Sequence, residues 1–137
     1  FRGILLMNIR QLFYCVYDPE NFHCVHFVIL AAKVIFGKDY TPCFLGLTGP
    51  LQESIKTSRT TVHRNKHIKK PEDGCIVLMT YLDQSSHVGL FFQGRIFHLI
   101  ERGPQRITVE QANSIFSRIR YYEPNLSLPE LSQQERS

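Results

Sequence analysis

The sequence lacks the features that mark several common classes of protein. It has no Cys-x-x-Cys pair, and its four cysteines, Cys15, Cys24, Cys43 and Cys75, have no regular spacing. A disulfide framework and a structural zinc site are therefore not expected in a chain of 137 residues, and free thiols fit a reducing compartment. No apolar run approaches the roughly twenty residues that a membrane-spanning helix needs, so we expect no membrane span.

Strong charge of one sign is also absent, because the formal net charge is only +4. This mild excess predicts at most some affinity for anionic surfaces. Basic residues concentrate between Lys56 and Lys70, which we interpret as a solvated loop or a surface helix. A nucleic-acid patch is the alternative, but no aromatic residues interleave with these charges for base stacking, so a nucleic-acid partner is not expected.

The length predicts one domain with a real core. We interpret Met7 as the natural start and residues 1–6 as an added or upstream-translated extension. Residues 7–124 then form a single catalytic domain, and the Ser-, Gln- and Glu-rich segment 125–137 is expected to be a mobile tail. The apolar run at residues 4–7 is too short for a signal-peptide core, which predicts synthesis in the cytoplasm without a signal peptide.

The first half of the chain has helical features. Turn residues at positions 18–21 precede a long apolar segment, so we expect a helix that starts at Asn21 or His23 and is stopped by Gly37. Apolar residues on nearly every side of this helix predict burial all round. Two shorter elements are expected on either side: a helix or strand over residues 7–16, and a short helix from Pro50 to about residue 57.

The second half reads as short strands joined by tight turns. A hairpin turn is expected at Gln93-Gly94. A helix through Phe116 is expected before the last strand. The expected strands cover residues 75–82, 87–92, 95–101, 105–109 and 119–122. This order predicts an α+β fold in which the helix at the start of the chain packs on an antiparallel meander.

A cysteine lies at the start of the apolar helix. Cys24 would occupy the first turn, where unpaired backbone N–H groups favour an anion, so we expect a lowered thiol pKa. Cysteine hydrolases prepare their nucleophile in this way. The alternative is that Cys24 is one more small buried apolar residue.

A nucleophilic thiol needs a base, and the sequence has six histidines. Four of them are poor candidates for the base. His63 and His67 lie in the basic segment. His23 and His26 flank Cys24 on a helix, where the side chains of adjacent residues point in different directions. His87 opens a strand after a polar turn, and His98 lies on the strand that the Gln93-Gly94 turn connects to it. The two can share a face, although His98 could simply be a satisfied histidine between strands.

Three segments together resemble the NlpC-type cysteine peptidase superfamily of papain-like fold. They are a cysteine that opens an apolar helix, then Gly-Cys-Ile-Val-Leu-Met, then His-Val-Gly-Leu-Phe-Phe-Gln-Gly-Arg-Ile-Phe-His. The resemblance implies that Cys24 is the nucleophile, His87 the base and His98 the group that orients the base. It also implies a substrate-binding tyrosine upstream of the cysteine, which could be Tyr14 or Tyr17. No metal or cofactor is implied.

The same resemblance implies hydrolysis of an amide bond in a peptidoglycan peptide. The protein would then be a secreted effector or a phage tail-associated enzyme that acts at the cell envelope, or it would stay in the phage particle. An immunity protein or a tail protein would be its partner. Two alternatives remain open: a tail-assembly or structural protein with a weak site, and an amidase or acyltransferase of the same superfamily.

Overall fold

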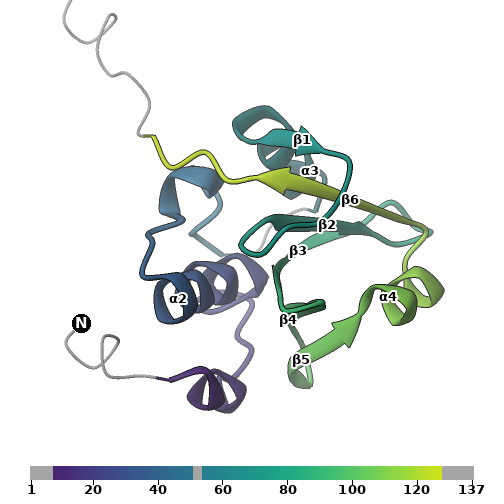
Figure 1. The fold of residues 1–137 in the computed structure, drawn as a ribbon. Helices are drawn as coiled ribbons and strands as arrows, with labels where there is room; N and C mark the ends of the chain where they lie inside the picture. The colour runs from purple at the N-terminus through teal and green to yellow at the C-terminus, as the bar shows by residue number, and fades with distance from the viewer. Residues whose placement is uncertain (1–7, 51–53, 128–137) are drawn as a thin grey trace, which may run out of the picture.

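A six-stranded antiparallel sheet lies at the centre of the fold in the computed structural model, which describes residues 8–50 and 54–127 (Figure 1). The strand order is β1-β6-β2-β3-β4-β5. The strands are β1 (Lys66–Ile68), β2 (Ile76–Thr80), β3 (Ser86–Phe92), β4 (Arg95–Ile100), β5 (Gly103–Thr108) and β6 (Arg118–Glu123). The helices are η1 (Ile9–Tyr14), α2 (Cys24–Phe36), η2 (Thr41–Phe44), α3 (Ser54–Arg64) and α4 (Val109–Ile115).

The sheet separates two hydrophobic cores. Helices α2 and α4 lie on opposite sides of it (Figure 1). Alternate side chains of β3, such as Val88 and Leu90, enter the core beneath α2, while Phe91 enters the core beneath α4. Helix α3 packs against β3 and η2. The predicted α+β class, with a helix from the start of the chain on an antiparallel sheet, is confirmed.

Helix α2 has the boundaries that its end residues predict. His23 is the N-cap, and Gly37 ends the helix in the left-handed conformation at φ 68°. None of its residues is exposed, in agreement with the apolar pattern. Within the described residues, no helix is long and apolar enough to cross a membrane, and all four cysteines are free.

Two features depart from the predicted meander. The basic segment forms most of α3 and then a short strand, β1, which no pattern in the sequence predicted. Strand β1 pairs with β6, and β6 returns from the end of the chain to pair with β2.

The expected helix or strand over residues 7–16 is the 3-10 helix η1. The proposed extension at residues 1–6 and part of the short helix expected after Pro50 lie outside the described residues.

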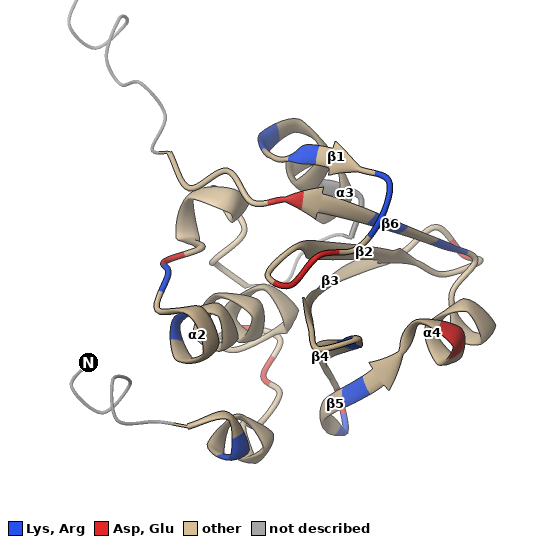
Figure 2. Ribbon diagram, in the orientation of Figure 1, with Lys and Arg blue, Asp and Glu red and all other residues tan. Residues whose placement is uncertain are grey.

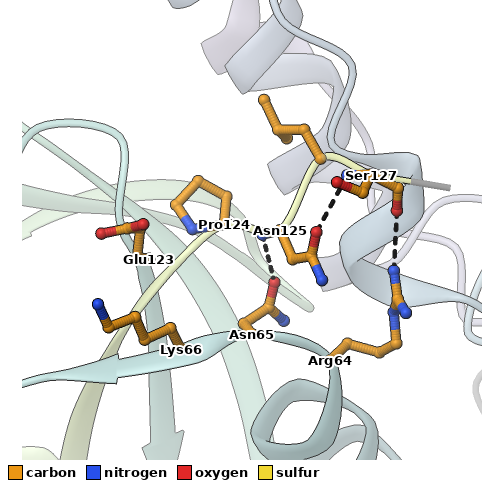
Figure 3. Close-up of a pocket in the computed structure, with 8 residues that line it drawn as sticks. Arg64, Asn65, Lys66, Glu123, Pro124, Asn125 and Ser127 are labelled. Carbon is orange, nitrogen blue, oxygen red and sulfur yellow. Dashed lines mark hydrogen bonds between the residues drawn. The ribbon is translucent and has the colours of Figure 1, made fainter. Parts of the chain in front are cut away.

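The segment after β6 is bound to the junction between α3 and β1 (Figure 3). The backbone N–H of Asn125 donates to the side-chain oxygen of Asn65 at 3.0 Å, and Arg64 donates to the carbonyl of Ser127 at 3.0 Å. The Cys43 thiol donates to the carbonyl of Asn125. The first three residues of the predicted tail are therefore held in place, and the rest of it lies outside the described residues.

Gly89 allows β3 and β4 to approach closely, and we expect Gly89→Ala to destabilise the fold by about 1–3 kcal/mol. An added Cβ would lie 2.8 Å from Cγ2 of Ile96 and 3.0 Å from both Cε of Met79 and the carbonyl oxygen of Phe97. The methionine can move, but the backbone carbonyl cannot move without shifting β4. Urea unfolding measures the loss. Gly49→Ala is the control, because nothing lies within 4 Å of its added Cβ, and equal stability of the two variants would contradict the expectation.

Candidate active site

Cys24 is the first residue of α2, and the histidine before it caps the helix. Nδ1 of His23 accepts a hydrogen bond from the backbone N–H of Val25 at 3.3 Å. Its Nε2 is 2.8 Å from the carbonyl oxygen of Gly49. Because Nδ1 is the acceptor, Nε2 carries the proton and donates to that carbonyl. His23 therefore fixes the helix start beside the thiol.

His26 completes this cap from one turn further along. Its Nδ1 accepts from the backbone N–H of His23 at 3.1 Å, and its Nε2 donates to the carbonyl of Thr48 at 2.7 Å. The arrangement is a capping box in which both side chains are histidines. Both rings are occupied in holding the segment at residues 48–49 against α2. Sequence reasoning set these histidines aside as bases and named His23 as a possible helix start, but histidine is not a usual cap residue, so the capping by the two side chains was missed.

The thiol of Cys24 lies where strands β3 and β4 separate. Pairing between these strands begins at Leu90 and does not extend back to Val88. The N–H of Phe91 bonds to the β2 side, so by alternation the N–H of Val88 points to the β4 side, where the ladder has ended. That N–H lowers the pKa of the Cys24 thiol, and Cys24 and Val88 lie in the same hydrophobic core. The start of α2 thus packs where the two strands separate, on the face of β3 that carries the residue after His87.

The rings of His87 and His98 are in contact. Their centroids are 5.1 Å apart with an interplanar angle of 90°, and both rings also pack against Phe116. The hairpin register predicts this proximity. Nε2 of His87 and both ring nitrogens of His98 are buried with no hydrogen-bond partner among the described residues. The two rings are therefore neighbours joined by an edge-to-face contact, with nitrogen atoms left unpaired.

Cys24 and the histidine pair approach β3 from opposite faces. Val88 belongs to the core beneath α2 together with Cys24, so the side chain of His87, one residue earlier, points to the α4 face. Its contacts with Tyr81 and Phe116 agree with this orientation. Because Nε2 of His87 has no partner within the described part of the chain, that nitrogen does not bind the thiol in this state.

The prediction of a lowered pKa for Cys24 is wrong. Burial raises the pKa of the Cys24 thiol to about 11, and the N–H groups of Val88, Val25 and Cys24 itself offset only part of this effect. Burial also lowers the pKa of His87 to about 3, with a smaller contribution from His98. A helix N-terminus stabilises a thiolate, but the loss of water around a side chain that is 3% exposed is larger. Thiol and imidazole are thus both neutral near pH 7.

The structure distinguishes the two candidate tyrosines. Tyr14 is 77% exposed, whereas Tyr17 packs against the core that contains Cys24. Burial raises the pKa of Tyr17, and the charge of Cys24 is the next contribution. Burial and the charges of Asp83 and Cys24 raise the pKa of Tyr81, whose ring packs against His87 and Phe116. Sequence reasoning missed Tyr81, although its position just before the turn that leads to His87 is a usable signal.

The low pKa values of His87 and His98 predict a loss of stability in acid. Their pKa values, about 3 for His87 and about 4 for His98, lie below the ordinary value of 6.5. The unfolded chain therefore binds protons first as pH falls through about 6.5, and the free energy of unfolding decreases until the folded rings protonate near pH 4 to 3. We expect a loss of about 2 kcal/mol per histidine between pH 7 and 5.

Urea unfolding at several pH values measures this dependence. His98→Leu removes one of the two titrating groups while keeping an apolar side chain in contact with Phe116, so its stability should fall less steeply between pH 7 and 5. Identical slopes for this variant and the native protein would contradict the assignment.

Within residues 8–50 and 54–127, no group of three or more His, Cys, Asp or Glu side chains could hold a metal ion. In comparisons with known proteins, no family model and no curated protein matches the sequence.

Proposed function

We propose that this protein is a cysteine hydrolase that cleaves amide bonds, with Cys24 as nucleophile and His87 as base. The observation that carries the proposal is the position of Cys24, which is the first residue of α2 and packs in the same core as Val88, the residue that follows His87. Cys24 at the start of α2 lies on one face of β3, and the contacting rings of His87 and His98 lie on the other face. These are the groups that acyl transfer through a thiol requires.

In the proposed mechanism, the thiol of Cys24 and the imidazole of His87 are both neutral before the reaction begins. The proton leaves the thiol as the sulfur attacks the carbonyl carbon, and His87 receives it, which requires the ring to turn toward the sulfur from its position in this state. The backbone N–H of Cys24, at the positive end of α2, stabilises the oxyanion. His87 then gives the proton to the leaving amine, and water hydrolyses the thioester. His98 holds the ring of His87.

The proposed substrate is a peptidoglycan peptide, cleaved between a γ-D-glutamyl residue and a diamino acid. This choice rests on the resemblance to the NlpC-type superfamily, and the papain-like assignment of the fold belongs to the same proposal. The protein would act at the cell envelope after secretion or as part of a phage particle, with an immunity or tail protein as partner.

Product analysis on purified muropeptides tests the proposal. Mass spectrometry should reveal two fragments whose masses sum to the substrate plus one water. Acyl-lipid and acyl-thioester substrates are run in parallel, because turnover of these alone would assign the protein to the amidase or acyltransferase alternative.

The burial of the thiol favours a second candidate, a structural protein with a weak site. Cys24 is 3% exposed, and a neutral, covered thiol reacts slowly. Alkylation by iodoacetamide at neutral pH separates the two functions when the modified cysteine is identified by peptide mapping. Faster modification of Cys24 than of the equally buried Cys75 would support the hydrolase, and equal rates would support the structural protein.

A further inference from the structure

A polar pocket of about 730 Å³ lies beyond the thiol, at the ends of β2, β3 and β6 and beside α3. Its volume is in the range that accommodates small ligands. Three arginines line it, Arg59 from α3 and Arg118 and Arg120 from β6, together with the hydroxyl groups of Thr80 and Ser86. The described residues that line it include no acidic side chain and no aromatic ring. Basic residues along β6 are visible in Figure 2.

The arginines have the features of an anion-binding site. Nε of Arg120 is buried and has no hydrogen-bond partner among the described residues. A buried donor without a partner costs free energy, and a ligand that supplies an acceptor removes this cost. Guanidinium groups bind carboxylates through paired, charge-assisted hydrogen bonds, so three of them around one pocket select a negatively charged group.

Cross-strand register places the pocket beside the thiol. Arg118, Thr80 and Ser86 are aligned across β6, β2 and β3, so their side chains share one face of the sheet. Arg120 is aligned with Val88 in the same way, through the intervening Leu78 of β2. Two strand spacings, about 10 Å, therefore separate Arg120 from Val88, which packs in the same core as Cys24.

We propose that this arginine pocket binds a carboxylate of the substrate whose amide bond Cys24 attacks. The inference rests on the proposed function and specifies it: the substrate is an acidic peptide rather than a neutral amide. A nucleic acid is the less suitable ligand, because the described lining offers no ring for base stacking. The site therefore contributes to substrate selection and positions the scissile bond on the α2 face of β3.

Calorimetric titration of the Cys24→Ala protein measures binding without turnover. The ligands are a γ-D-glutamyl-diaminopimelate peptide with free carboxylates and the same peptide with its carboxylates converted to carboxamides. Arg118→Ala removes an exposed side chain, so the fold should persist. We expect it to weaken binding of the free peptide by roughly ten- to a hundredfold, the loss of one charge-assisted bond, and to leave the carboxamide peptide unaffected.

Arg106→Ala is the matched control, because Arg106 is exposed on β5 and does not line the pocket. Equal affinity for the two peptides, or equal affinity of the Arg118 and Arg106 variants, would overturn the inference. Arg118-dependent binding of a single-stranded oligonucleotide in preference to the peptide would overturn it as well. Carboxylate binding without hydrolysis by the native protein would retain the anion site and remove the proposed function, so the two failures are distinguishable.

Discussion

Replacing Cys24 by alanine is expected to abolish amide hydrolysis, because in the proposed mechanism the thioester forms on the sulfur of Cys24. Loss of the nucleophile should lower kcat by several orders of magnitude, to the background of the uncatalysed reaction. The change also removes a buried sulfur from the core beneath α2, so we expect a loss of about 1 kcal/mol in the free energy of unfolding. Turnover of one muropeptide and urea unfolding of the same preparation measure the two effects.

Cys75→Ala is the matched control for this experiment. Cys75 is buried to the same degree but belongs to the core beneath α4. Its replacement should cost similar stability and leave hydrolysis intact. Full activity in Cys24→Ala or Cys24→Ser would place the nucleophile elsewhere in the chain.

Local signals account for the part of the fold that the sequence predicts. A capped apolar segment that ends in glycine defines α2, and a two-residue turn at Gln93-Gly94 defines the β3–β4 hairpin, so both follow from neighbouring residues. The pairing of β6 with β2 joins segments separated by most of the second half of the chain. No local pattern encodes that pairing, and β1 is a strand only because the edge of β6 is available to it.

The candidate site likewise combines features that local sequence signals predict with features that arise only when the chain folds. Cys24, His87 and His98 are recognisable because their residue types and positions carry chemical information. The environment of the thiol depends on packing, because side chains from separate segments, such as Tyr17 and Val88, pack in the core that contains Cys24. The residue types therefore suggest candidates for the site, but the predicted direction of the Cys24 pKa shift is wrong. Sequence reasoning also missed the arginine pocket, because Arg118 and Arg120 meet Arg59 only in the folded chain.

The two site histidines should differ in importance. His87→Ala is expected to reduce kcat/KM by several orders of magnitude, because it removes the group that accepts the thiol proton. His98→Ala should cost roughly ten- to a thousandfold, because His98 only holds the ring of His87 through the edge-to-face contact at 5.1 Å.

Substitution of His98 by asparagine or glutamine tests whether it acts by orienting His87. A side-chain amide oxygen can accept the N–H of the His87 ring, so either variant should recover part of the activity that His98→Ala loses. The measurement is kcat/KM for each variant on one peptide, with circular dichroism to establish that the fold persists. The buried nitrogens of His98 have no partner in this state, so a gain on substitution would show that the contact forms during the reaction. If His98→Ala is indistinguishable from the native protein, then His98 is only a core histidine beside Phe116, and Tyr81, which also contacts His87, becomes the candidate for orienting the base.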